Sequence, residues 1–405
     1  MNFGKVACWA ASKRVRGVLS LLMALAAAQC SAPMPPLPTR PPADRVVRVA
    51  ILTPMTGELA TFGETVRNGI TLAFDEWNDR GGVKGMFIEW VLEDTRCDPL
   101  QARQAAERAV REHQVDFIVG GVCSEEAVPI ARVADELGVL FVAATATHPL
   151  VTVDDQGNTR PLVFRASYDY PYQGRAAARF ALNELGARRA GVLNNPGDDF
   201  VRSLRDEFRA AFVEGGGQMA LAPTDAQSTP QGNQPGSASK DLDGMLAAMA
   251  KAAPEVLYVP DAYPVANQIG RLLRAQGLEV AMVGSEVWNS GALDLEAMEG
   301  AYLTLHYSRD APNPLAEAWR ERYLSAFAIE PDTLSALGYD AANLLATAME
   351  GADDLSARAV ARRLENIEYQ GVTGDWRFDA RHNPLKPVVV ARIEEGNIVF
   401  NTTVR

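Results

Sequence analysis

Polar side chains stand at the ends of three predicted strands, where loops lead into helices. Ser124 follows the segment 120–123 and precedes a helical pattern, so its hydroxyl and the free N–H groups of the helix start suit a carboxylate. Thr145 and Thr147 add hydroxyls after the next strand, and Glu286 adds a carboxylate in the second half. The hydroxyl and N–H donors suit the carboxylate of an α-amino acid, and the carboxylate of Glu286 suits its ammonium group.

Each of these residues also has a simpler structural explanation. Ser124 is a natural N-cap, the two threonines fit an ordinary polar loop, and a lone glutamate such as Glu286 is usually solvated. A catalytic interpretation fits poorly, because the sequence has no GxSxG, HExxH or CxxC motif. We therefore expect a binding protein that is not an enzyme and that uses no cofactor and no metal.

Two of the four cysteines fall in the part of the chain that is expected to fold. Cys8 lies in the N-terminal leader and Cys30 at its cleavage site, so Cys97 and Cys123 remain. An exported protein meets an oxidising compartment, which favours one disulfide between them. Each stands at the end of a strand just before a helix, and we expect these strands to be adjacent, which brings the side chains within bridging distance.

The first 45 residues have the anatomy of a secretory leader followed by a spacer. Basic residues precede an apolar stretch that is too short to span a bilayer, and we assign residues 1–28 to a signal peptide. Residues 29–45 are rich in proline and predict an extended spacer. Cys30 resembles a lipidation site, but Gln29 precedes it, so lipidation of Cys30 and ordinary cleavage before Gln29 both stay open. Either route predicts a periplasmic protein or one that is lipid-anchored at the cell envelope.

Apolar runs and helical patterns alternate along the rest of the chain. This alternation is typical of a parallel sheet with helices on both faces, and the 405 residues suit two such lobes. We predict an α/β fold of two Rossmann-like lobes. The expected strands lie at 46–52, 87–92, 116–120, 139–143, 189–193, 256–260 and 280–283, and the expected helices at 64–79, 100–112, 125–137, 201–212 and 264–276.

The formal net charge of −12 argues against two classes of partner. Nucleic acids and anionic membranes both require clustered lysine and arginine, and no basic run follows the leader. We expect contact with a membrane only through a lipid on Cys30. The segment 224–239 is rich in Gln, Ser, Gly, Asn and Pro and predicts an exposed insertion, to which we assign no function.

Several motifs, in the same order along the chain, resemble those of a known family. The chain is similar over nearly all of its mature part to the type I periplasmic binding proteins of branched-chain amino acid ABC transporters, the leucine/isoleucine/valine-binding group. The resemblance implies capture of an amino acid or similar small molecule by hinge closure, and delivery to the permease of an ABC importer. The motifs are Thr53–Gly57 with Phe62–Gly63, Asn68–Gly69, Gly81–Gly85, Asp94 with Cys97–Pro99, Cys123–Ser124, Ala144–Pro149, Phe164–Arg165 with Gln173–Gly174, and Gly338–Ala341.

The resemblance also implies how the lobes are joined and where the ligand contacts fall. Three crossings at about residues 166, 306 and 376 divide the chain into a first lobe, 46–166 plus 307–376, and a second lobe, 167–306 plus 377–405. A disulfide is implied between Cys97 and Cys123. The implied ligand contacts are Ser124 and Thr147 for the carboxylate, with backbone groups around Thr145 and Ala146, then Glu286 for the ammonium group, aromatic positions at Phe62 and Phe200, and a further position near Asp261.

Two departures from the family pattern affect the expected ligand. Phe62 and Phe200 stand where tyrosines are common, which makes the pocket more apolar. Glu125 and Glu126 follow Ser124 where small neutral residues are common. They either place favourable charge in the first turn of the helix or indicate a less anionic ligand. The alternative function is an envelope regulatory or sensory lobe that acts on a protein partner, because fold alone does not decide function.

Overall fold

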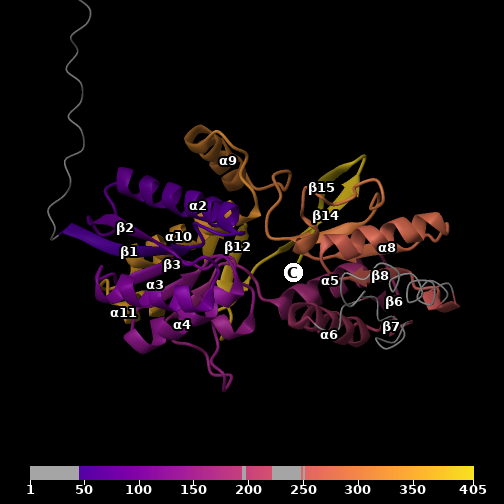
Figure 1. Cartoon of the computed structure of the whole chain (residues 1–405), viewed down its shortest axis with the longest axis horizontal. Coiled ribbons are helices and arrows are strands. Elements are labelled where there is room, and N and C mark those ends of the chain that lie inside the picture. The colour runs from indigo at the N-terminus through magenta and orange to yellow at the C-terminus, as the bar shows by residue number, and fades with distance from the viewer. Residues whose placement is uncertain (1–44, 194–197, 221–247, 250) are drawn as a thin grey trace, which may run out of the picture. The chain divides into compact units, whose positions relative to one another are not determined.

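Two β-sheets, each covered by helices, make up most of the chain (Figure 1). The computed structural model describes residues 45–193, 198–220, 248–249 and 251–405. The predicted signal peptide, Cys30, almost all of the proline-rich spacer and the predicted insertion 224–239 lie outside these residues. None of the helices in the described ranges is both long enough and apolar enough to cross a membrane.

The first sheet is entirely parallel, with the strand order β2-β1-β3-β4-β5. Alternate residues of β1 face opposite sides, so Val49 and Ile51 pack into one core cluster and Ala50 and Leu52 into another. The central strands β1, β3 and β4 are buried on both faces and are apolar almost throughout, whereas the edge strand β2 is partly exposed and carries Glu89, Glu93 and Asp94. The strands are β1 (Val46–Thr53), β2 (Phe87–Asp94), β3 (Phe117–Gly120), β4 (Leu140–Ala143) and β5 (Val163–Arg165).

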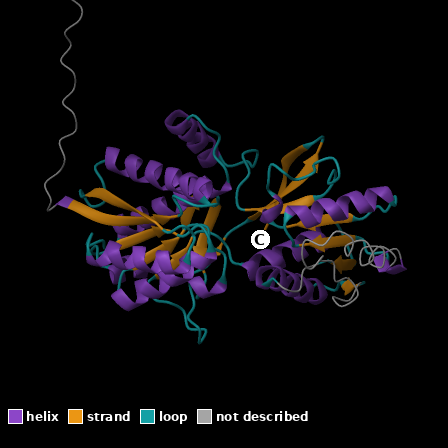
Figure 2. Ribbon diagram, viewed as in Figure 1, coloured by secondary structure: helices purple, strands orange, loops and turns teal. Residues whose placement is uncertain are grey.

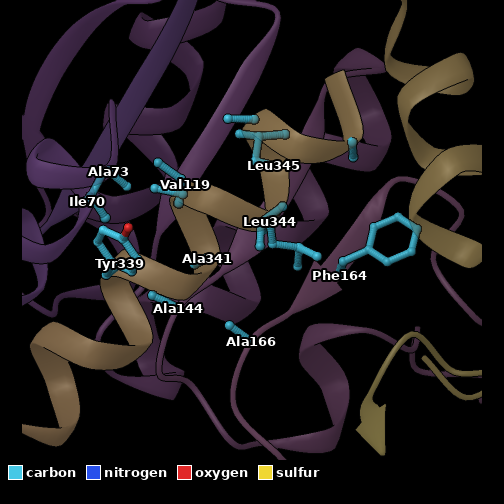
Figure 3. Close-up of a cluster of buried hydrophobic side chains, with 14 of the residues drawn as sticks. Ile70, Ala73, Val119, Ala144, Phe164, Ala166, Tyr339, Ala341, Leu344 and Leu345 are labelled. Atoms are coloured by element: carbon cyan, nitrogen blue, oxygen red, sulfur yellow. The ribbon is translucent and has the colours of Figure 1, made fainter. Parts of the chain in front are cut away.

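Helices cover both faces of the first sheet, as Figure 2 shows. α2 (Ala60–Asp79), α10 (Thr333–Gly351) and α11 (Ala357–Glu365) pack on one face. Figure 3 shows part of that core, in which Leu344 and Tyr339 of α10 lie among side chains from the sheet and from α2. α3 (Pro99–Arg111) and α4 (Ser124–Leu137) pack on the other face.

The second sheet repeats the strand order of the first and then extends it. β7-β6-β8-β9-β10 are parallel in the order that β2-β1-β3-β4-β5 show, and β14 and β15 add two antiparallel strands beside β10. α5 (Tyr170–Asn183) and α6 (Asp199–Glu214) pack on one face, and α8 (Tyr263–Ala275) packs on the other. The strands are β6 (Arg189–Val192), β7 (Gln218–Met219), β8 (Val256–Val259), β9 (Ala281–Gly284), β10 (Tyr302–Leu305), β14 (Val388–Glu394) and β15 (Asn397–Val404).

The predicted α/β class and the predicted strands and helices are confirmed, with ends that differ by a few residues. The predicted start of α3 is confirmed in detail: Asp98 is the N-cap and accepts a hydrogen bond from the N–H of Gln101 (2.8 Å), and Pro99 begins the helix. α2 begins one turn earlier than the predicted residue 64, without a side-chain cap at Leu59.

The last passage of the chain from the first sheet to the second lies later than the expected residue 376. Phe378, which ends β12 (Gly374–Phe378), packs edge-on against Phe164 at 5.2 Å between ring centroids, and His382 stacks on Phe164 at 4.0 Å. The chain then enters the second sheet at Val388. We propose that the third crossing lies at about 386–388.

Lys386 connects this third passage to the first one. Its buried ammonium group donates to the carbonyl of Ala166 and to the hydroxyl of Thr373, both at 2.9 Å. Tyr168, two residues beyond Ala166, stacks on His306 at 3.6 Å between ring centroids. The segments that leave β5, β10 and the β12 region therefore meet around one buried lysine.

Candidate functional site

The residues singled out from the sequence follow the carboxyl ends of parallel strands in both sheets. In the first sheet the chain runs from β1 outward to β2 and from β3 outward to β4, so its direction of winding reverses between β1 and β3. In the second sheet the same reversal lies between β6 and β8. Open α/β sheets bind ligands at such points, beyond the carboxyl ends of the strands.

A disulfide joins Cys97 and Cys123 beside the reversal point of the first sheet, with 6.0 Å between their Cα atoms. The expectation that their strands are adjacent is wrong, because β1 lies between β2 and β3. The loop after β2 folds back over the end of β1, where the N–H of Thr95 donates to the carbonyl of Thr53 (3.1 Å). This turn brings Cys97 across β1 to Cys123.

Glu126 is completely buried beneath this disulfide. Its carboxylate accepts hydrogen bonds from the hydroxyl of Thr95 and from the N–H groups of Val122, Cys123 and Cys97. Burial raises the pKa of Glu126 to about 7, and these hydrogen bonds oppose the rise. Neither favourable charge in the first turn of α4 nor a less anionic ligand is needed to explain Glu126. Its carboxylate accepts hydrogen bonds that hold the loops before α3 and α4. The cysteine sulfurs also lie near this carboxylate, but the disulfide leaves no thiolates to bind a metal.

Ser124 is the first residue of α4, and the prediction that it caps the helix is wrong. Cys123 occupies the N-cap position, because the loop turns sharply at Gly120. A Cβ atom at Gly120 would lie 2.1 Å from the carbonyl oxygen of Leu52, and the residue has φ +133°. The Ser124 hydroxyl is therefore free of a capping role, and it accepts a hydrogen bond from the N–H of His148 (3.3 Å).

The loop after β4 places its two threonines differently. The Thr145 hydroxyl donates to the carbonyl of Val122 (2.8 Å), which ties this loop to the one before α4. The Thr147 side chain instead hydrogen-bonds to the hydroxyl of Tyr170. Ala146 is buried, and its carbonyl accepts a hydrogen bond from the Ser167 hydroxyl (3.0 Å). Of the three predicted positions in this loop, only Thr147 directs a polar side chain toward the surroundings of Ser124.

Arg165, the last residue of β5, holds this loop in place. Its buried guanidinium donates to the carbonyls of Ala146 (3.3 Å) and His148 (2.9 Å) and to the hydroxyl of Thr152 (3.1 Å). Burial lowers the pKa of Arg165 to about 10, so the group stays charged at neutral pH. The sequence motif included this arginine without assigning it a role.

Tyr170 lies at the centre of the predicted residues, and the sequence analysis did not identify it. Its hydroxyl is 3.3 Å from the Ser124 Oγ and also bonds to Thr147. Its ring packs edge-on against Phe200, with 4.7 Å between centroids. The available signal was the sequence Asp169–Tyr170–Pro171, which predicts a helix start at the edge of the sheet.

Glu286 begins a short 3-10 helix, Glu286–Trp288, after β9 and is half-buried. The side-chain amide of Gln173 donates to its carboxylate and also to the hydroxyl of Thr304 (2.8 Å). Burial raises the pKa of Glu286 to about 7. The other amide atom, Gln173 Oε1, is buried and has no hydrogen-bond partner among the described residues. The Glu286 carboxylate and this oxygen therefore both have capacity to accept from a further donor.

The remaining predicted residues are not all brought together. Asp261 is buried, and its carbonyl accepts a hydrogen bond from the indole of Trp288 (3.0 Å). Phe200 lies against Tyr170, as described, and is half-buried. Phe62 is 48% exposed in the first turn of α2. The structure thus groups Ser124 and Thr147 with Phe200, and leaves Phe62 open to solvent.

Known proteins resemble this chain over most of its length. The leucine-, isoleucine-, valine-, threonine- and alanine-binding protein of Pseudomonas aeruginosa is 27% identical over 342 residues, which cover 83% of this chain and 86% of that protein. The crystal structure of the leucine-binding protein LivK from Thermotoga maritima matches with a TM-score of 0.70 and 31% identity, covering 89% of this chain and 99% of the other. The sequence profile of the periplasmic binding proteins matches residues 46–397. The chain belongs to the periplasmic binding protein family.

Proposed function

We propose that this protein is a solute-binding protein that captures an amino acid and delivers it to an ABC importer. The observation that carries the proposal is the half-buried carboxylate of Glu286, which no cationic side chain in the described part of the chain neutralises. A buried carboxylate without a cation is costly. The ammonium group of an amino acid supplies the missing cation, and the hydroxyls of Ser124 and Thr147 supply donors for its carboxylate.

The surroundings of Ser124 support binding without catalysis. A serine nucleophile needs a base within hydrogen-bonding distance. The nearest histidine, His148, contacts Ser124 through its backbone N–H, while its ring Nδ1 accepts a hydrogen bond from the N–H of Leu150 (3.1 Å). The Nδ1 atom is therefore engaged by the backbone of its own loop, and the contact of His148 with Ser124 runs through its main chain, so we propose that the protein is not an enzyme.

The names of the relatives support an aliphatic amino acid as the first candidate ligand. The Pseudomonas protein is named for leucine, isoleucine, valine, threonine and alanine, and the Thermotoga protein for leucine. We propose that the two sheets and their helices close on the ligand by a hinge at the three crossings. We further propose that the protein acts in the periplasm or from a lipid anchor on Cys30, with the permease of an ABC importer as its partner.

A thermal-shift screen of the purified protein tests the proposal. The ligands are the amino acids, their amides, urea, small carboxylates and aromatic acids. A ligand at about 100 times its Kd stabilises the folded state by about 2.7 kcal/mol, so a selective rise in the unfolding midpoint with amino acids is expected. A rise only with amides, urea or aromatic acids contradicts the assigned ligand. No rise with any small molecule contradicts the proposal and favours an envelope regulatory lobe that acts on a protein.

A further inference from the structure

We propose that Tyr170 binds the carboxylate of the ligand and sets the selectivity of the site for carboxylates over carboxamides. This inference rests on the proposed function, since it concerns the same site. Neither the sequence motifs nor the expected ligand contacts include this residue. It lies where the two hydroxyls assigned to the ligand carboxylate meet an aromatic side chain of the second sheet's helices.

The backbone of Tyr170 is held firmly at the start of α5. Its N–H donates to the carbonyl of Thr147 (3.3 Å), which fixes the helix start against the loop after β4. The preceding residue, Asp169, is the N-cap and accepts a hydrogen bond from the N–H of Tyr172 (2.9 Å). Pro171 follows within the first turn, where a missing N–H costs nothing. The position of the phenol therefore follows from backbone contacts on both sides of it.

The phenol hydroxyl reaches both predicted carboxylate ligands. It lies 3.3 Å from Ser124 Oγ and hydrogen-bonds to the Thr147 side chain. Burial raises the pKa of Tyr170, so the phenol remains a protonated donor at neutral pH. Three hydroxyls thus converge at one place: one from the first residue of α4, one from the loop after β4, and one from the first residue of α5.

The ring of Tyr170 is fixed as well. Only 8% of the residue is exposed. Its ring packs edge-on against Phe200 at 4.7 Å and against His148 at 5.8 Å between centroids. A side chain held in this way loses little conformational freedom when it binds a ligand. The hydroxyl is therefore already placed for an anion, and its contribution to binding is separable from the packing of its ring.

The chemistry of three converging hydroxyls favours a carboxylate over a carboxamide. Both oxygens of a carboxylate accept hydrogen bonds, so each hydroxyl is able to donate to the ligand. A carboxamide replaces one oxygen with an NH₂ group, which cannot accept from the phenol. Because bonds to a charged acceptor are the stronger ones, removal of the Tyr170 hydroxyl reduces binding of the acid far more than binding of the amide.

The substitution Tyr170→Phe tests this, since it keeps the ring and removes one oxygen. The ligands are the amino acid that stabilises the wild-type protein most in the screen and its α-carboxamide, each titrated by calorimetry. We expect Kd for the amino acid to rise about tenfold, as one hydrogen bond to a charged group implies, and Kd for the amide to change less than about twofold. The matched control is Tyr172→Phe, because Tyr172 lies on the same turn but donates to the carbonyl of Lys386 (2.8 Å). The ratio of the Kd for the amino acid to the Kd for its amide should be the same in Tyr172→Phe as in the wild type.

The outcomes separate this inference from the proposed function. If the wild-type protein binds no amino acid, the proposed function fails and the inference fails with it. If the wild type binds and Tyr170→Phe binds the acid as tightly or more tightly, only the inference is overturned. If Tyr172→Phe raises the ratio of the Kd for the amino acid to the Kd for its amide as strongly as Tyr170→Phe does, the effect comes from the helix start and the direct contact is refuted.

Discussion

Glu126 and Glu286 are both glutamates at helix starts, but the fold supplies their carboxylates with different numbers of hydrogen-bond donors. Each lies within the first three residues of a helix that follows a parallel strand, and burial raises the pKa of each to about 7. Glu126 receives four hydrogen bonds from its own loop and from the loop joined to it by the disulfide. Among the described residues, Glu286 receives two, from Gln173 and from its own backbone N–H.

The supply of hydrogen-bond donors distinguishes a buried acid with a structural role from one that is available to bind a ligand. A carboxylate removed from water needs donors or a cation. The fold supplies the donors for Glu126, and this carboxylate stabilises the loop before α4. Around Glu286 the fold leaves capacity unused, and the buried hydroxyls of Tyr168 and Tyr258 add two groups with no hydrogen-bond partner in the described part of the chain. The burial of an acid therefore says less about function than the supply of partners does.

The substitution Glu286→Gln tests the binding side of this comparison and should have the largest effect. It removes the charge that the ligand ammonium requires, and loss of one partner of a buried ion pair costs about 3–5 kcal/mol. We expect the Kd for an amino acid to rise by about 150- to 5,000-fold in calorimetric titrations, with a nearly unchanged unfolding midpoint. The control Glu125→Gln alters an exposed acid beside the same site. Unchanged binding in Glu286→Gln would contradict the ammonium assignment.

Removal of the disulfide tests the structural side. The two cysteines are 26 positions apart, and closure of a loop of this length stabilises a protein by about 3 kcal/mol. We expect the double substitution Cys97→Ala with Cys123→Ala to lower the free energy of unfolding in urea by this amount. Reduction of the wild-type protein should give a loss of similar size. Two free thiols in protein purified from an oxidising compartment would show that the bond does not form.

The pH dependence of binding should separate the two acids. Since the raised pKa of Glu286 is about 7, a proton competes with the ligand ammonium below neutrality. We expect affinity to be about tenfold weaker at pH 6 than at pH 8. This pH dependence of affinity should persist in Glu126→Gln, because the Glu126 carboxylate is hydrogen-bonded to the loops before α3 and α4. If Glu126→Gln abolishes the pH dependence of affinity, the acid that controls binding is Glu126 and not Glu286.

The pH dependence of stability tests the structural role of Glu126. The folded-state pKa of Glu126 is above the ordinary value of 4.5, so its protonated form contributes stability below about pH 4.5 that is lost as pH rises through 7. We expect the wild-type free energy of unfolding to fall between pH 5 and pH 8, and the fall to be smaller in Glu126→Gln by about 2.5 kcal/mol. Urea denaturation at both pH values measures this. Equal falls in the two proteins would show that Glu126 does not titrate in this range.

The α/β class, the order of strands and helices and the pairing of Cys97 with Cys123 were accessible from the sequence. Their signals are local or few in number: apolar runs alternate with helical patterns, Asp98 and Pro99 mark the start of α3, and only two cysteines were available to pair. Such signals depend on the residue and its near neighbours, so a sequence carries them openly.

The tertiary structure alone decided which side chains share a site. Gln173 and Glu286 are 113 positions apart, and Ser124 and Tyr170 are 46 apart, so no local pattern joins either pair. The same limit explains why Ser124 was expected to cap α4 and why the burial of Glu126 was missed. The cap position depends on the turn at Gly120 against Leu52, and the burial of Glu126 depends on how the loop after β2 crosses the end of β1. Packing between distant segments determines both paths, and the residue types along one segment do not specify it.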